Sequence, residues 1–200
     1  MQTDTDYYDG RWNKISNVRL FFTELNIAFL PKDLINNCRE ELIEYNKHNE
    51  SGVKNYFSTH GTSLETTHNV GKATELVNHS VERLARQIVK RKVSIANSFF
   101  NYVPKGCWHP KHSHGDKNMI CAIVYFDDIG HTRFYDPRPQ VFNFEWYPEE
   151  ADKGKVVFFP GWLEQEMPPH DEDEYRITMP FNMAIGEWNE KTNIQYCGFT

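Results

Sequence analysis

The sequence predicts an α+β fold, in which a β-barrel or jelly roll carries helices packed on its outside. Helical periodicity is confined to the first half of the chain, and seven short β-prone segments follow from residue 93. Helices followed by a run of strands with short turns are typical of this class. A length of 200 residues fits one domain. We expect an N-terminal arm and helices over 1–92, a β core over 93–184 and a tail over 185–200.

The N-terminal half is predicted to hold one strand and two helices. Residues 18–22 are expected to form a strand. The first helix is expected from about residue 30 to 48, because Pro31 suits the first helical position and Asp33 the first turn. The second is expected over 74–92. Each carries one apolar stripe at helical spacing: Leu34, Cys38, Leu42 and Tyr45 in the first, and Val77, Val81, Leu84 and Ile88 in the second.

The β core is predicted from short apolar or alternating segments separated by turn residues. Residues 119–126 are continuously apolar, which is typical of a buried strand, and residues 141–147 alternate as a half-buried strand does. The predicted strands cover 93–103, 119–126, 132–135, 141–147, 154–160, 162–167 and 175–184.

Composition narrows the partners that we expect. The formal net charge is −6 and the chain has no Lys/Arg-rich run, which disfavours a nucleic-acid backbone as the main partner. The four cysteines form no Cys-x-x-Cys pair, which favours thiols in a reducing compartment. No signal segment and no apolar run of membrane-spanning length stands out. We therefore expect a cytoplasmic protein that does not bind membranes.

Three candidate metal ligands stand directly before the buried strand 119–126. His112, His114 and Asp116 occupy every second position, and β-conformation points alternate side chains to one side, so all three can converge on one ion. Two histidines and a carboxylate with open positions form the facial triad of non-haem Fe(II) oxygenases. On spacing alone, a hydrated loop before a strand remains the alternative.

A second constellation lies in the last predicted strand. Arg176 and Thr178 share one face, and a guanidinium with a hydroxyl fits a carboxylate. The alternative is a solvated pair on a sheet face. If this strand lines the barrel mouth near residues 112–116, the buried guanidinium needs an anion. We therefore expect His114 and Arg176 to open onto one shared cavity.

These residues resemble the Fe(II)- and 2-oxoglutarate-dependent dioxygenases, and in particular a branch of small bacterial and phage proteins. The resemblance implies a double-stranded β-helix, Fe(II), ascorbate as reductant, and 2-oxoglutarate held by Arg176, Thr178 and Tyr125. It also implies hydroxylation of a small molecule or a protein side chain, in the host cytoplasm for a phage protein. Four segments carry it: Asn101 with 112–114 leading into 122–125, then 135–138, 159–163 and 176–182.

The chain departs from this family pattern at two points. The wider superfamily shows His-x-Asp and the branch His-x-His, so both the pair His112/His114 and the pair His114/Asp116 remain open. The branch also reads Trp-Leu-x-His before Val-Pro, whereas Gln165 stands here at the distal histidine position. We take His112, His114, Asp116 and Gln165 as the candidate metal ligands.

The substitution at residue 165 leaves three outcomes open. Gln165 can complete an altered metal site, because an amide oxygen is a neutral and poorer ligand than imidazole. Alternatively, His170 or His109 replaces the missing histidine. In the third outcome the site has lost its metal, and the protein is a non-catalytic binding or structural barrel.

Overall fold

The computed structural model describes residues 15–20, 23–49, 57–58, 70–115, 118–137 and 146–186. The helices are α1 (Lys32–Asn49) and α2 (Lys72–Val89). The strands are β1 (Ser16–Leu20), β2 (Thr23–Phe29), β3 (Phe57–Ser58), β4 (Val93–Ser98), β5 (Asn101–Val103), β6 (His109–His112), β7 (Met119–Tyr125), β8 (His131–Tyr135), β9 (Trp146–Glu150), β10 (Lys155–Pro160), β11 (Gln165–Met167) and β12 (Arg176–Ile185).

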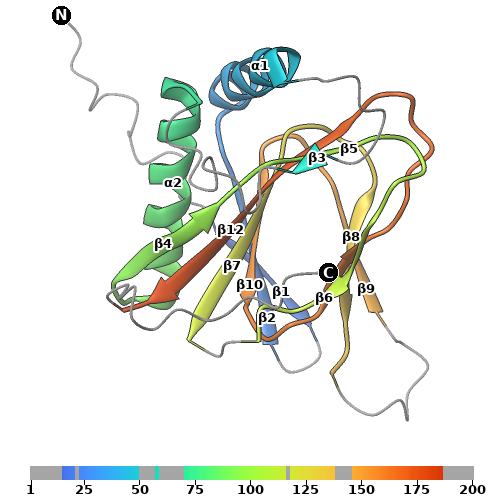
Figure 1. Ribbon diagram of the computed structural model, residues 1–200. Coiled ribbons are helices and arrows are strands. Elements are labelled where there is room, and N and C mark those ends of the chain that lie inside the picture. The colour runs from blue at the N-terminus through green and yellow to red at the C-terminus, as the bar shows by residue number, and fades with distance from the viewer. Residues whose placement is uncertain are drawn as a thin grey trace, which may run out of the picture.

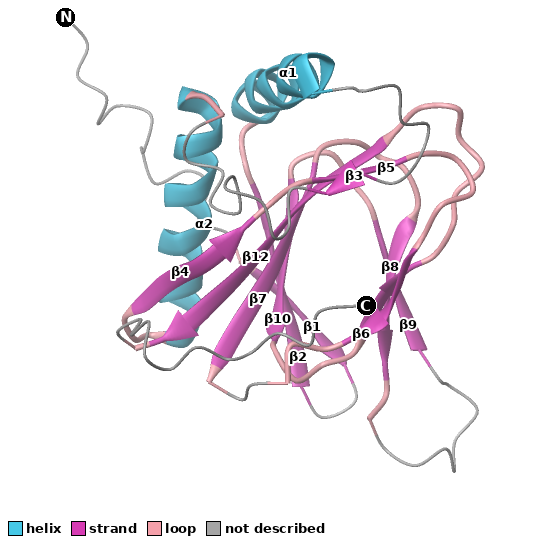
Figure 2. Cartoon of the chain, viewed as in Figure 1, coloured by secondary structure: helices cyan, strands magenta, loops and turns pink. Residues whose placement is uncertain are grey.

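The strands form two antiparallel sheets. The large sheet has eight strands in the order β1-β2-β10-β7-β12-β5-β3, with β4 also paired to β12. The small sheet has four strands in the order β6-β11-β8-β9. Figure 1 shows the small sheet on one side of the large sheet and both helices on the other. Figure 2 shows the same arrangement, with the strands in two layers and the helices beside them.

The central pair of the large sheet is β7 with β12, in a register that sets Thr178 opposite Tyr125 and Phe181 opposite Ala122. Every residue of β7 is buried because the strand is covered on both faces. Successive side chains alternate between the faces. Ala122 and Phe181 join a core shared with the helices, whereas Ile123 and Tyr125 join a core between the sheets.

The two helices contact each other through a partly buried carboxylate as well as through apolar side chains. The apolar stripes of both helices contribute to the helix-side core. Glu41 of α1 accepts hydrogen bonds from the backbone N–H groups of Ala73 and Thr74, each at 2.9 Å. These donors belong to the first turn of α2, which lacks a side-chain cap of its own. Neither helix in the described part of the chain is long and apolar enough to cross a membrane.

The predicted elements differ from the observed ones in a few places. The alternating strand β2 was not predicted. The predicted strand 162–167 is shorter, because residues 161–163 form a turn in which the Leu163 N–H donates to the Pro160 carbonyl over 3.0 Å. Residues 138–145 and 187–200 lie outside the described residues, so the start of the predicted strand 141–147 and most of the tail do too.

Candidate functional site

A small cavity lies between the two sheets, beside the strand that carries the histidines. Its volume is about 20 Å³, which is the room that one water molecule or one ion needs. Strands of both sheets contribute to its wall, together with the segment that follows β6. The lining residues are Phe99, Asn101, His109, His112, His114, Ile123, Gln165, Met167 and Pro180.

Three histidine rings stand together on the β6 side of the cavity. The ring centroids of His112 and His114 are 5.3 Å apart, and those of His109 and His112 are 4.4 Å apart. Nδ1 of His112 lies 2.8 Å from the Pro110 carbonyl oxygen. Because a carbonyl only accepts, Nδ1 carries the proton, and in the neutral ring Nε2 keeps its lone pair. Such a bond orients metal-binding imidazoles in many sites.

Gln165 faces the same cavity from the neighbouring strand. β11 pairs with β6 so that Gln165 is the Cα partner of His112. Its Nε2 lies 3.4 Å from Nε2 of His112, so the amide N–H donates toward the imidazole lone pair. The residue is 5% exposed, and its Oε1 is buried without a hydrogen bond to any described residue. A buried carbonyl oxygen without a donor is costly, and a cation or a donor in the cavity would satisfy it.

The other candidate ligands are placed differently. Asp116 lies outside the described residues. His170 does not line the cavity; its Nε2 lies 2.8 Å from the Val103 carbonyl oxygen. His109, the other candidate replacement, does line the cavity. Among the described residues, no group of three or more His, Cys, Asp and Glu side chains is arranged to hold an ion.

The residues expected to hold the cosubstrate form a second cluster on the barrel side of the large sheet. Arg176 and Thr178 project from β12 toward the small sheet, and both are almost fully buried. Nη1 of Arg176 donates to the Pro168 carbonyl over 3.0 Å. A Cβ on Gly130 would lie only 2.8 Å from this nitrogen, so the guanidinium would have to shift, and the φ of +72° at this position itself favours glycine.

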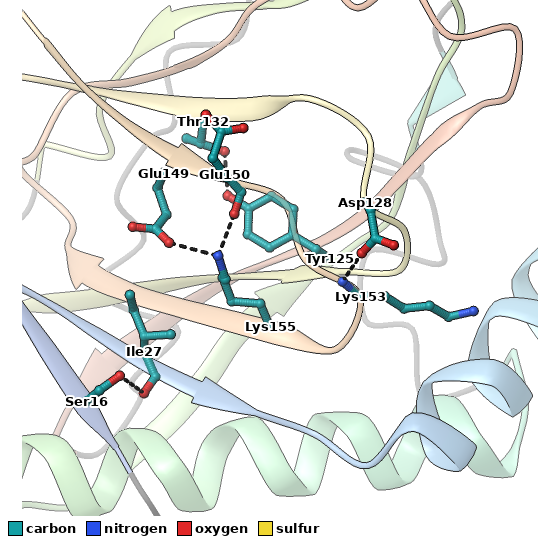
Figure 3. Close-up of polar contacts among 9 residues, drawn as sticks. All are labelled: Ser16, Ile27, Tyr125, Asp128, Thr132, Glu149, Glu150, Lys153 and Lys155. Carbon is teal, nitrogen blue, oxygen red and sulfur yellow. Dashed lines mark hydrogen bonds and ion pairs between the residues drawn. The ribbon is translucent and has the colours of Figure 1, made fainter.

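Tyr125 completes this second cluster. Its hydroxyl lies 2.6 Å from Oγ1 of Thr132, as Figure 3 shows. Burial raises the pKa of this phenol, so it stays protonated. Figure 3 also shows Lys155, which belongs to β10 of the large sheet. Its Nζ lies 3.1 Å from Oε1 of Glu149, a buried residue of β9 in the small sheet.

Met167 links the histidine cavity to the second cluster, which consists of Arg176, Thr178 and Tyr125 and is called the arginine cluster below. Arg176 and Thr178 do not line the cavity, but Met167 does, so, contrary to the expectation from the sequence, the cavity that His114 lines is not shared with Arg176. Oγ1 of Thr178 donates to the Met167 sulfur over 4.0 Å. The backbone thus brings the two predicted constellations to the same barrel interior, and Met167 stands where they meet.

Sequence reasoning missed two residues of this region. Met167 follows Gln165 by two residues in β11, so both side chains lie on the same face of the strand. This spacing could have identified Met167 from the sequence. No sequence pattern around Asp127 indicates that it contacts this region. Its carboxylate accepts from the N–H groups of Ile129 at 3.2 Å and Ile177 at 2.7 Å, which flank Gly130 and Arg176. Burial raises the pKa of Asp127 to about 6.

Comparisons with solved structures identify the fold. A prolyl-4-hydroxylase from Pseudomonas putida superposes with a TM-score of 0.58 at 14% identity, covering 86% of this chain and 93% of that one. AviO1 from Streptomyces viridochromogenes gives 0.64 at 15%, covering 80% and 89%. HygX from Streptomyces hygroscopicus, with nickel and 2-oxoglutarate bound, gives 0.64 at 11%, covering 88% and 91%. No protein-family model and no curated protein matches the chain.

At this level of identity the likeness concerns the fold. The chain shares the antiparallel two-sheet architecture of iron- and 2-oxoglutarate-dependent oxygenases, the double-stranded β-helix. A fold does not by itself imply a function. What the chain does has to be argued from the cavity and the residues around it.

Proposed function

We propose that the protein is an Fe(II)- and 2-oxoglutarate-dependent oxygenase that hydroxylates a small molecule or a protein side chain. One observation carries the proposal: two imidazoles and the side chain of Gln165, whose Oε1 is buried without a hydrogen bond to any described residue, line one ion-sized cavity in the interior of a double-stranded β-helix. A buried guanidinium and hydroxyl, the pair that suits a carboxylate, project into the same barrel interior from the large sheet.

The donors fit a divalent first-row metal. His112 Nε2 and the His114 ring supply imidazole, which suits iron, and Gln165 supplies a neutral oxygen. The bond from His112 to Pro110 fixes the ring so that Nε2 faces the cavity. The Gln165 amide donates toward that nitrogen, so metal binding requires the amide to rotate and present Oε1. Amide nitrogen and oxygen are nearly equal in size, so the rotated form fits the same space.

Other residues of the chain would bind 2-oxoglutarate and exclude water from the site. Arg176 and Thr178 would bind the far carboxylate of 2-oxoglutarate, and Tyr125, held by Thr132, would lie beside them as a neutral phenol. The buried apolar lining would exclude bulk water, as oxygenase chemistry needs. When bound, Fe(II) and 2-oxoglutarate would activate O₂, the oxidant of the reaction, so that one oxygen atom enters the substrate C–H bond and the other enters succinate as 2-oxoglutarate loses CO₂.

Succinate formation tests the proposal. The protein is incubated aerobically with Fe(II), ascorbate and 2-oxoglutarate, and succinate is measured with and without candidate substrates. We expect slow uncoupled turnover in the wild type, loss of it in His112→Ala, and retention in His79→Ala, because His79 is exposed on α2. The absence of succinate under every condition, or equal turnover in the two variants, contradicts the proposal.

A second function, a binding barrel without a redox metal, is favoured by Gln165. Gln165 stands at the position where the family resemblance implies a histidine, so the site has one imidazole fewer than the family pattern. Titration with Co(II) followed by visible absorption separates the two functions. Metal binding by the wild type supports the oxygenase. Binding that appears only in Gln165→His supports the binding barrel.

A further inference from the structure

Met167 lies between the histidine cavity and the arginine cluster, in contact with both. The residue lines the cavity, is 6% exposed, and has its sulfur 4.0 Å from Oγ1 of Thr178. The next residue, Pro168, accepts the hydrogen bond from Arg176 Nη1 at 3.0 Å. The C-terminal end of β11 thus contacts both members of the carboxylate-binding pair.

The size of the cavity makes this contact important. A volume of about 20 Å³ holds an ion or a water molecule, whereas a five-carbon dicarboxylate is many times larger. A ligand that chelates a metal at His112 and His114 and also reaches Arg176 must pass the position of Met167. Of the apolar side chains lining the cavity, methionine is the one with an unbranched, flexible stem that can change its conformation.

We infer that Met167 determines which 2-oxo acids the site accepts, and that it has to leave Thr178 before a dicarboxylate can bridge the histidines and Arg176. The inference rests on the proposed function and adds a specificity-determining residue to it. Moving Met167 does two things at once: it opens the path, and it releases the Thr178 hydroxyl to donate to the incoming carboxylate. The cost of this movement lowers the affinity for 2-oxoglutarate and leaves a shorter chelating acid unaffected.

Ligand binding to the Ni(II)-loaded protein tests the inference without requiring turnover. Affinities for 2-oxoglutarate and for oxalate are measured by calorimetry in the wild type, Met167→Val and Met167→Leu. Oxalate chelates a metal but is too short to extend toward Arg176. Leucine has nearly the volume of methionine, and both variants remove the sulfur from Thr178, so comparing them isolates side-chain size.

We expect Met167→Val to bind 2-oxoglutarate roughly tenfold more tightly than the wild type, with oxalate unchanged and no gain in Met167→Leu. Urea unfolding verifies that each variant is folded, and Met167→Cys, which is also smaller than methionine, replaces the valine variant if that one does not fold. Equal 2-oxoglutarate affinity in wild type and Met167→Val overturns the inference. Equal gains in the valine and leucine variants also overturn it, because size would then play no part.

The same data separate this inference from the proposed function. Binding of 2-oxoglutarate that is insensitive to residue 167 leaves the proposed function standing and removes only the inference. Binding of Ni(II) and oxalate without any binding of 2-oxoglutarate in any variant contradicts the proposed cosubstrate. In that case the inference falls with it.

Discussion

The two faces of the large sheet have different compositions although they belong to the same strands. On β12, Ile177 and Phe181 point toward the helices into a core built mainly from apolar side chains. Arg176 and Thr178, which alternate with them, point toward the small sheet, where Gln165 and Thr132 are also buried. On the helix-side face, the side chains of these strands are mostly apolar. The other face holds polar groups whose burial costs free energy unless they find partners.

This difference separates stability from function within single strands. The helix-side core can stabilise the fold by apolar burial alone. On the barrel side, a guanidinium, an amide and a hydroxyl are buried in place of apolar side chains. This side therefore contributes less apolar burial to the free energy of unfolding. Changes on the helix side should therefore reduce the free energy of unfolding, and changes on the barrel side should mainly alter ligand binding.

The largest expected effect is on the helix side. Phe181 is fully buried there, so Phe181→Ala should lower the free energy of unfolding by about 3–5 kcal/mol. On the opposite face, Thr178→Val removes a hydroxyl that contacts only a weak sulfur acceptor, and should cost less than about 1 kcal/mol. Urea denaturation measures both. A larger loss for Thr178→Val than for Phe181→Ala would invalidate the comparison of the two faces.

A smaller effect is expected at the ion pair between the sheets. Lys155 and Glu149 are 12% and 7% exposed and lie 3.1 Å apart. Lys155→Met leaves a buried carboxylate without its cation and should lower the free energy of unfolding by about 3 kcal/mol. The double variant Lys155→Met/Glu149→Gln should regain most of this loss. Equal destabilisation of the single and double variants would mean that the charge of Glu149 is not responsible.

Asp127 predicts a pH effect near the arginine cluster. Burial raises its pKa from 3.8 to about 6, against the hydrogen bonds from Ile177 and Ile129, which lower it. Between pH 3.8 and about 6, the Asp127 carboxyl is therefore mostly protonated in the folded state and mostly ionised in the unfolded state. Its contribution to stability is complete below about pH 4 and is lost as the pH rises through 6, by roughly 2–3 kcal/mol. Unfolding of wild type and Asp127→Asn from pH 4 to 7 measures this loss, and parallel curves would contradict it.

The smallest effect is expected on the solvent side of the small sheet. Lys111 and Glu164 form an ion pair at 3.2 Å, with side chains 47% and 42% exposed. Exposed pairs contribute little, so Lys111→Gln should change the free energy of unfolding by less than about 0.5 kcal/mol. Chemical denaturation at low and high salt checks this value. A loss approaching that of Lys155→Met would show that exposure does not separate the two pairs.

Patterns that repeat along the chain predicted most of the fold. The apolar stripe of α2 and the continuous apolar run of β7 each gave an element close to its observed bounds. The alternate spacing of His112 and His114 anticipated two rings at one cavity, and their role as ligands stays a prediction. Gln165 stood out because it departs from the family pattern.

The remaining features depend on contacts between distant segments. Asp127 acts on Ile177, fifty residues away in the chain, and no local pattern announces such a bond. The position of Met167 against Thr178 depends on side-chain packing between β11 and β12. The sequence could place Met167 on the face of Gln165, but not show that it separates the histidines from Arg176.

The affinity of the protein for Ni(II) tests the central claim most directly, because the claim is that the barrel interior binds a metal through His112, His114 and Gln165. Calorimetry compares the wild type with His114→Ala and with His79→Ala, a matched change at an exposed histidine of α2. We predict one tight site in the wild type and in His79→Ala, and at least a roughly tenfold weaker site in His114→Ala. Equal affinities in all three proteins would contradict the account.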